Sequence, residues 1–195
     1  MREGYDIKEK PKITELLNLN VPFILASKSP RRRRLLTQLG FEFGIMPAEI
    51  DEDDIDINDP AEFVTSLALA KAETIAAKLD EKAVILGSDT TVVIDGKMIN
   101  KPADKDEAFR MLKTLSGRTH TVYTGIALVE SVSGRFVTDL QKTDVHFREL
   151  DDDEIKAYID TGSPMDKAGV YGIQDDFGAV FVDNIEGCYY NIVGL

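Results

Sequence analysis

The stretch that most constrains this 195-residue sequence covers residues 23–36, where a short apolar segment is followed by four consecutive arginines. Residues 23–26 are typical of the end of a buried strand, and residues 27–29 have the composition of a turn. Ser29 can cap a helix that begins at Pro30, because proline lacks an N–H that the first helical position does not need. The stretch therefore predicts a strand, a tight turn and a helix.

Four arginines in the first turn of a helix are unfavourable by themselves, since the helix N-terminus is already positive and each nearby cation costs about 0.3–1 kcal/mol. A bound anion would offset that cost, and phosphate suits the N–H, hydroxyl and guanidinium groups that meet there. At about 100° per residue, Arg31 and Arg32 fall on the core-facing side, while the other two arginines fall on the flanks and back. We expect Arg31 and Arg32 to line an anion site; the alternative is a solvated basic turn.

Composition limits the partners of such a site. The formal net charge is −12, so the overall field repels nucleic acid and anionic membrane, and a polyanion must bind in a local cationic pocket, helped by a divalent metal. Cys188 is the only cysteine, which excludes an intramolecular disulfide and fits a reducing compartment. Because neither a signal peptide nor a membrane-spanning apolar run is visible, we expect a cytoplasmic protein of one domain or two small lobes.

Apolar periodicity predicts alternating helices and strands, hence an α/β fold. We expect residues 1–22 to be an N-terminal extension and residues 23–195 to be a single domain. Helices are predicted over 12–19, 60–79, 104–115 and 151–160; strands over 41–45, 83–87, 92–94, 97–99, 119–130 and 135–149, with a C-terminal hairpin of 179–182 and 189–193.

Asp89 is the strongest candidate for a catalytic group. Residues 83–87 form an unbroken apolar run, so the predicted strand is central and places Asp89 at its carboxyl end, where open α/β sheets bind ligands. A carboxylate there can bind a metal or take a proton from water, although many such residues only cap a turn. Lys71 falls within the apolar stripe of the helix over 60–79, where a lysine either snorkels to water or neutralises a ligand.

Four cations on three separate segments suit phosphate oxygens, and carboxylates suit a bridging metal. The four cations are Arg31, Arg32, Lys71 and Lys101. The acidic loop over 51–59 either supplies a metal-binding carboxylate near Glu52 or is solvated surface. His120 and His146 lack partners at zinc-ligand spacing and are expected to be structural or exposed, and no P-loop motif is present.

Five ordered motifs and a closing segment resemble the Maf family. They are ASKSPRR at 26–32, SDT at 88–90, KP at 101–102, LSGRTHTV at 115–122 and DKAGVYGIQ at 166–174, with NIVGL at 191–195. The resemblance implies a two-lobed α/β fold in which a mixed sheet with flanking helices surrounds a central cleft, similar to inosine triphosphate pyrophosphatases. It also implies hydrolysis of a nucleoside triphosphate to the monophosphate and pyrophosphate with Mg²⁺ or Mn²⁺.

The resemblance further implies residue roles. Asp89 would be the proton acceptor and a metal ligand, and Glu52, or a neighbouring acid, would assist the metal. Three positions would distinguish family members by the base of the nucleotide on which they act. With a threonine after the catalytic aspartate, the sequence resembles the branch acting on dTTP and UTP. The phosphates would be held by Ser27, Arg31, Arg32, Lys71 and Lys101, and the base-sorting positions are Arg31, Thr90 and Gln174.

Alternatives and departures accompany this resemblance. The same cleft would also suit a pyrophosphatase for modified purine nucleotides, or a non-catalytic nucleotide-binding regulator of cell division. The sequence is compatible with a homodimer, whereas nucleic acid and membrane are not expected as partners. Thr91 stands where relatives more often have an aliphatic residue, and the sequence stops at Leu195, where relatives usually continue into a proline and a terminal helix.

Overall fold

The computed structural model describes residues 17, 19–50, 57–174 and 177–195. Most of the predicted short helix over 12–19 lies outside these residues. So does most of the acidic loop over 51–59, including Glu52. Within the described part of the chain, none of the helices combines the length and the hydropathy that crossing a membrane requires.

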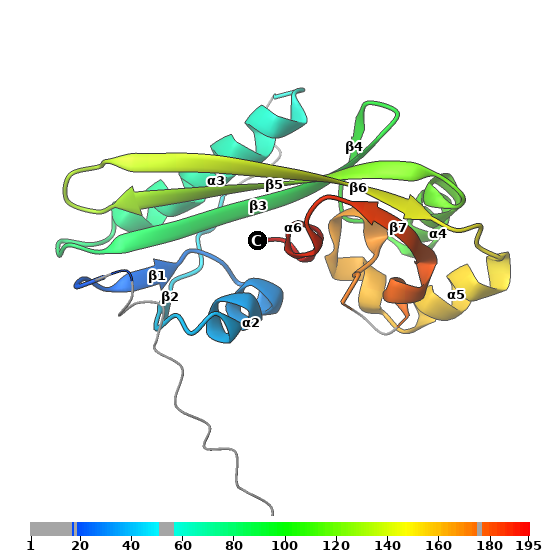
Figure 1. The fold of residues 1–195 in the computed structure, drawn as a ribbon, viewed down its shortest axis with the longest axis horizontal. Coiled ribbons are helices and arrows are strands. Elements are labelled where there is room, and N and C mark those ends of the chain that lie inside the picture. Colours follow the sequence, from blue (N-terminus) through cyan, green and yellow to red (C-terminus); the bar gives the residue numbers. More distant parts are fainter. Residues whose placement is uncertain (1–16, 18, 51–56, 175–176) are drawn as a thin grey trace, which may run out of the picture.

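A seven-stranded mixed sheet organises the molecule (Figure 1). β1 runs parallel to both β2 and β3, whereas the remaining neighbours are antiparallel. The strand order is β2 (Gly44–Ile45), β1 (Phe23–Leu25), β3 (Val84–Ile94), β5 (Thr119–Glu130), β6 (Phe136–Phe147) and β7 (Val182–Glu186), with β4 (Lys97–Ile99) paired to β3 beside this path. The α/β architecture with a mixed sheet and flanking helices is therefore as predicted.

The helices begin where their capping residues predict. Asp59 and Asp104 each accept a hydrogen bond from the backbone N–H three residues later, at the starts of α3 and α4. Asp151 forms a capping box at the start of α5. The helices are α2 (Pro30–Gln38), α3 (Pro60–Ala76), α4 (Lys105–Leu115), α5 (Asp152–Asp160) and α6 (Tyr189–Val193), and the 3₁₀ turns are η1 (Ser163–Asp166), η2 (Ala168–Val170) and η3 (Gly178–Phe181).

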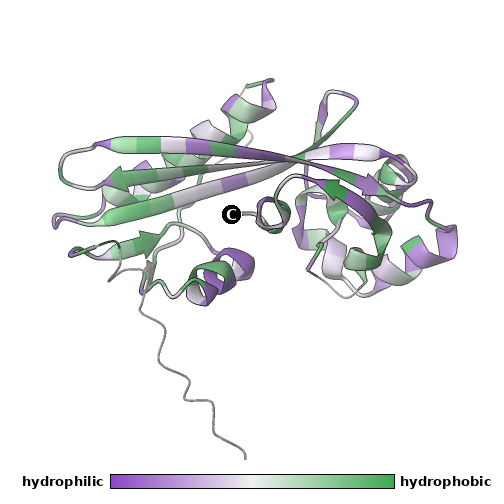
Figure 2. Ribbon diagram, viewed as in Figure 1, coloured by the Kyte–Doolittle hydropathy of each residue, from purple (hydrophilic) through white to green (hydrophobic). Residues whose placement is uncertain are grey.

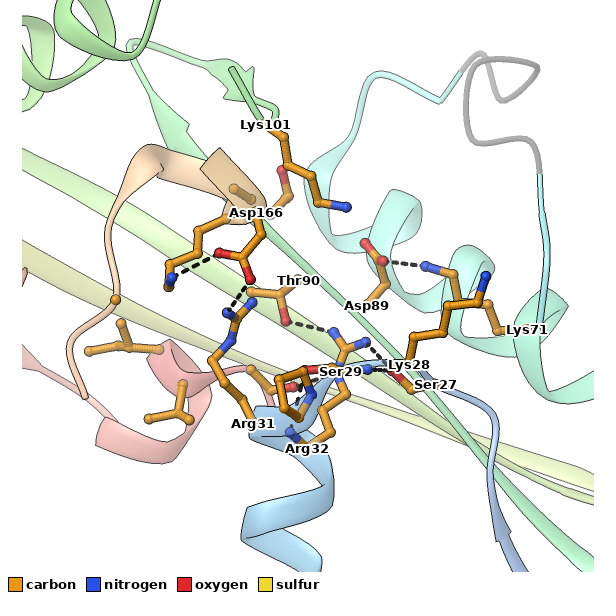
Figure 3. Close-up of a pocket in the computed structure, with 18 of the residues that line it drawn as sticks. Ser27, Lys28, Ser29, Arg31, Arg32, Lys71, Asp89, Thr90, Lys101 and Asp166 are labelled. Carbon is orange, nitrogen blue, oxygen red and sulfur yellow. Dashed lines mark hydrogen bonds and ion pairs between the residues drawn. The ribbon is translucent and has the colours of Figure 1, made fainter. Parts of the chain in front are cut away.

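Two glycines bring α3 unusually close to the sheet. A Cβ atom on Gly87 would lie 1.9 Å from the backbone oxygen of Ala68, and one on Gly125 would lie 2.6 Å from that of Val64. Only hydrogen fits at either position, so α3 packs its backbone directly on β3 and β5. This close approach sets the position of Lys71, which projects from α3 toward β3 (Figure 3).

Separate hydrophobic cores form at the two ends of the long strands. One includes Leu112, Phe147 and Tyr158 and lies with α4 and α5, while others pack α3 and β1 against the beginning of β3. Figure 2 shows β1 and the beginning of β3 as hydrophobic, in contrast to α2, where most of the ribbon has hydrophilic colours. The two lobes expected from the sequence correspond to these two ends, which the strands β3 and β5 join.

Three sequence predictions about strands were wrong. The strand predicted over 83–87 continues through Asp89 to Ile94, because its polar residues remain paired with β5 while Asp89 and Thr90 line a pocket. The strand predicted over 41–45 is reduced to β2. The predicted C-terminal hairpin does not form: residues 178–181 are the turn η3, β7 follows, and residues 189–193 form the helix α6.

Tertiary contacts explain why α6 is a helix despite its β-favouring composition. The side-chain amide of Asn191 donates to the backbone oxygen of Val122 on β5 and to Thr143 Oγ1 on β6, at 3.0 and 2.8 Å. Asn191 is 1% exposed, so these bonds are made in the interior. Such buried contacts outweigh the local preference of a five-residue segment.

Candidate active site

The candidate site lies at a gap in the sheet. β1 pairs with β3 as far as Leu86, and β4 pairs with β3 only from Val92 onward. No strand of the described chain flanks Asp89 and Thr90 on that side of β3. A cavity of about 570 Å³ opens there, and its walls come from the N-terminus of α2, from α3, from the segment after β4 and from the loop containing η1 and η2.

The N-terminus of α2 enters this cavity as the sequence predicts. Ser29 caps the helix by accepting a bond from the backbone N–H of Arg32 at 3.4 Å, and Pro30 occupies the first turn. Arg31 and Arg32 are half-buried and line the cavity, whereas the next two arginines are exposed. Helical geometry thus correctly separated the arginines that face the site from those that face solvent.

Three neutral acceptors hold the guanidinium group of Arg32. Its Nε donates to the backbone oxygen of Gly194 at 2.9 Å, Nη1 to Ser27 Oγ at 3.3 Å, and Nη2 to Thr90 Oγ1 at 3.2 Å. Figure 3 shows Arg32 lying between Ser27 and Thr90. Because the acceptors come from three distant segments, they fix the guanidinium plane.

Arg31 is held by an acidic residue, Asp166, that was not predicted from the sequence to be in the site. Its Nη1 lies 3.5 Å from Asp166 Oδ2, and the other oxygen of Asp166 accepts from Lys167 Nζ at 2.8 Å. Burial alone would raise the pKa of Asp166. The hydrogen bond from Lys167 and the positive charges of Lys167 and Arg31 together outweigh burial, so the pKa of Asp166 is lowered. Asp166 is the first residue of the DKAGVYGIQ motif. The motif therefore pointed to this position, although residue spacing did not predict a role for it.

Lys71 and Asp89 form the most enclosed ion pair of the site. Lys71 Nζ lies 2.7 Å from Asp89 Oδ1, and each side chain is 12% exposed. Lys71 therefore does not snorkel away from the apolar face of α3. Lys101, which follows β4, extends its side chain toward Asp89 from the opposite wall (Figure 3).

Eight of the predicted site residues line this one cavity: Ser27, Arg31, Arg32, Lys71, Asp89, Thr90, Lys101 and Gln174. Glu52, the ninth, lies outside the described residues. The structure thus brings the predicted cations around Asp89, as the anion-site interpretation requires. Their individual roles stay predictions.

His120 is a buried structural residue, in line with the expectation for it. Its Nε2 lies 2.9 Å from the hydroxyl of Tyr171, and its ring contacts the rings of Tyr171 and Phe147. Its Nδ1 has no hydrogen-bond partner among the described residues. Burial lowers the pKa of His120 to about 4, against a weaker opposing effect of Asp144, and it raises the pKa of the Tyr171 phenol.

The described residues fit a divalent metal only if phosphate supplies most of its ligands. They contain no group of three or more histidine, cysteine, aspartate or glutamate side chains placed to hold an ion. The cavity does offer hard oxygen donors, chiefly the carboxylate of Asp89. Mg²⁺ is commonly held by one or two carboxylates together with substrate phosphates and water, and that arrangement agrees with this donor set.

Comparison with known proteins identifies the family. A family model described as Maf-like protein matches residues 22–195. The dTTP/UTP pyrophosphatase of Thermoanaerobacter sp. (strain X514) is 49% identical over 172 residues, which cover 88% of this chain and 89% of that protein. The dTTP/UTP pyrophosphatase of Moorella thermoacetica is 52% identical over 172 residues, 88% of each chain.

Two solved structures align with part of this chain. A HAM1 protein from Coxiella burnetii aligns with a TM-score of 0.44 and 18% identity over 65% of this chain and 73% of that one. A nucleoside-triphosphatase / dITP/XTP pyrophosphatase from Mycobacterium abscessus aligns with a TM-score of 0.41 and 14% identity over 67% and 76%. The family-model match and the identities to the curated relatives show that this chain belongs to the Maf family.

Proposed function

We propose that this chain hydrolyses dTTP and UTP to the nucleoside monophosphate and pyrophosphate. The observation that carries the proposal is the convergence of four cations from three separate segments on one cavity beside the carboxylate of Asp89. The names of the relatives, which are about half identical over most of the chain, point to the same reaction. The negative charge of the whole molecule makes this local cluster the natural place for a triphosphate.

The cationic side chains would bind the triphosphate in an extended arrangement. Arg31 and Arg32, at the N-terminus of α2, present guanidinium groups that match phosphate oxygens, and the first backbone N–H groups of the helix point the same way. Lys71 and Lys101 reach the region of Asp89 from opposite walls. This distribution would place the phosphorus atoms next to the carboxylate and stabilise the charge that develops on the leaving pyrophosphate.

Asp89 would orient or deprotonate the water that attacks the α-phosphorus. Its ion pair with Lys71 fixes the carboxylate within the cavity, which favours a defined direction of attack. Asp89, with Glu52 as the second carboxylate suggested by the family resemblance, would also hold Mg²⁺ or Mn²⁺. When bound, such an ion would neutralise phosphate charge and polarise the bond to the leaving group.

Base selection would depend on the part of the cavity near Thr90 and Gln174. Both residues line the cavity, and the Gln174 amide offers a donor and an acceptor that match the alternating groups of a uracil or thymine ring. Cytosine presents the reverse pattern at the corresponding ring positions, so the amide would have to turn end for end to pair with it. We therefore expect dTTP and UTP to be better substrates than CTP.

The decisive experiment is pyrophosphate release from a panel of canonical and modified nucleoside triphosphates with Mg²⁺ or Mn²⁺ added. We expect the highest kcat/KM for dTTP and UTP. The Asp89→Asn variant should lose at least about 10³-fold in kcat while it still binds nucleotide, because it keeps the shape of the site but cannot take a proton. A preference for purines would overturn the base assignment, and full activity of Asp89→Asn would remove that carboxylate from catalysis.

A further inference from the structure

A chain of hydrogen bonds leads away from Arg32 into the interior of the protein. Arg32 Nη2 lies 3.2 Å from Thr90 Oγ1, Thr90 Oγ1 lies 2.9 Å from Thr124 Oγ1, and Thr124 Oγ1 lies 2.9 Å from the backbone oxygen of Asn191. Thr124, on β5, is 3% exposed and does not line the cavity. We propose that Thr124 is a positioning residue, which fixes the phosphate-binding guanidinium of Arg32 through Thr90.

The direction of every bond in this chain follows from the chemistry of its two ends. The carbonyl of Asn191 can only accept, so the single hydroxyl proton of Thr124 is donated to it. Thr124 must then accept a hydrogen bond from Thr90, so the only hydroxyl proton of Thr90 is donated to Thr124. The guanidinium of Arg32 can only donate, so Thr90 accepts from it. The order is therefore Arg32 to Thr90 to Thr124 to the Asn191 carbonyl, with no alternative orientation of the hydroxyls.

The acceptor at the end of this chain is itself fixed. Asn191 is tied to β5 and β6 through its side-chain amide, and the N-terminal end of α6 is tied to β6 where Cys188 exchanges two backbone hydrogen bonds with Thr143 Oγ1. The same segment supplies the backbone oxygen of Gly194, which accepts directly from Arg32 Nε. α6 and the residue after it thus hold the guanidinium at two points.

This arrangement changes what Thr90 can contribute to ligand binding. Its proton is already given to Thr124, so toward a ligand the hydroxyl can act only as an acceptor. Its main contribution is then to hold Arg32 in one orientation. A guanidinium group that is ordered before the phosphate arrives loses less conformational freedom on binding, so the hydroxyl chain should strengthen anion binding without touching the anion.

The test compares variants that differ only in the hydroxyl of Thr124, with inorganic tripolyphosphate as the probe and calorimetry as the readout. We expect Thr124→Val to weaken tripolyphosphate binding by about tenfold, which is near the upper end for losing one hydrogen bond between neutral groups. Thr124→Ser, which keeps the hydroxyl, should bind within about twofold of the parent. Should the valine variant not fold, Thr124→Cys replaces it, since a thiol has the size of the serine side chain but donates only weakly.

A matched control is available on β5. Thr121, three residues before Thr124 on the same strand, is half-buried, donates its hydroxyl proton to Asp144 Oδ1 at 2.6 Å and does not line the cavity. Thr121→Val removes a hydroxyl of the same size, with its hydrogen bond, from the same strand, so it should leave tripolyphosphate binding unchanged. Equal losses in Thr121→Val and Thr124→Val would show a general effect of valine on β5 and would overturn the proposal.

A double-mutant cycle shows whether Thr124 acts through Arg32. In an Arg32→Lys background the guanidinium is gone, so adding Thr124→Val should cause no further loss of tripolyphosphate binding. A full additional tenfold loss would mean that Thr124 acts independently of Arg32 and would overturn the proposal. A destabilising, purely structural role of Thr124 would appear in both backgrounds equally.

The turnover part of the test rests on the function proposed above, and here Thr124→Val should raise KM for UTP more than it lowers kcat. If the parent bound tripolyphosphate but hydrolysed no nucleotide, the proposed function would fail, while a loss of binding in Thr124→Val would still support the positioning role. If the parent did not bind tripolyphosphate, Arg32 would not be an anion-binding residue and the positioning proposal would fail.

Discussion

At the scale of single residues, His120 links the stability of the site to pH. It is 1% exposed and contacts Tyr171, whose loop forms one wall of the cavity. Its pKa is about 4 in the folded protein, against an ordinary value of 6.5 for histidine, so the unfolded chain binds this proton first as the pH falls. Folding stability should therefore be fully present above pH 6.5 and decrease toward pH 4, with a contribution from His120 of about 3 kcal/mol.

Urea denaturation between pH 4.5 and 7.5 measures this effect. A His120→Gln variant, which cannot titrate in this range, should lose the part of the pH dependence that is steepest below pH 6.5. The carboxylates remain in both proteins, and the pKa of Asp166 is lowered, so their loss of stability occurs at more acidic pH and is common to both. An unchanged pH slope in His120→Gln would contradict the assignment.

Residue roles could be predicted from sequence where the relation between residues is local. Helical geometry separated Arg31 and Arg32 from the two exposed arginines, because all four lie within one turn. It could not reveal Asp166 or Thr124, since their links to the arginines join segments that are far apart in the chain. Such contacts depend on the strand register and on loop conformation, neither of which a spacing rule contains.

At the scale of elements, helix starts were predicted best because a capping side chain acts on its own helix. Asp59, Asp104 and Ser29 are examples, each bonded to a backbone N–H three residues later. The polar residues at 88–90 ended the predicted central strand too early, because Asp89 and Thr90 line the cavity, Ser88 is buried, and side-chain polarity says nothing about backbone pairing. The hairpin predicted at the C-terminus was wrong because the buried contacts of Asn191, rather than local propensity, make residues 189–193 a helix.

The close packing of α3 on the sheet leads to a prediction at this scale. Gly125→Ala would place a methyl group 2.6 Å from the backbone of Val64, so α3 must move away from β5. We expect a loss of about 2–3 kcal/mol in the free energy of unfolding, in the range found for overpacked interiors. Because Lys71 is carried by the same helix, kcat should fall as well.

Urea denaturation and UTP turnover measure the two effects. Gly44→Ala is the matched control, since its Cβ would meet only Ile24 Cγ1 at 3.8 Å, an ordinary contact. This control should stay within about 0.5 kcal/mol of the parent. A Gly125→Ala protein as stable and active as the control would show that α3 can adjust without cost, and that Lys71 does not depend on this packing.

At the scale of the whole molecule, the fold concentrates positive charge in one place on an acidic protein. The cations converge because β1 and β4 pair with different parts of β3, which leaves a gap that α2, α3 and the segment after β4 all border. Composition predicted that a polyanion would need a local pocket, and the sequence motifs predicted which residues form it. The gap itself could not be foreseen, because it arises from where two strand pairings stop.

This charge distribution predicts that the protein binds single nucleotides but not nucleic acid. A net charge of −12 repels a long polyanion, whereas a triphosphate is small enough to enter the cavity. A 20-nucleotide single-stranded oligodeoxyuridylate should therefore not inhibit UTP hydrolysis at 50 mM salt, while tripolyphosphate should compete with UTP. The measurement is steady-state turnover with each competitor.

Salt dependence separates a true exclusion from weak binding. Non-specific nucleic-acid binding strengthens steeply as salt is lowered, because it is driven by release of counterions. Inhibition by the oligonucleotide that grew on lowering the salt would contradict the prediction and would point to the exposed Arg33 and Arg34 on the outer face of α2. An Arg33→Gln/Arg34→Gln variant should then lose that inhibition. Without such binding, the same variant should hydrolyse UTP as the parent does, because these two arginines do not line the cavity.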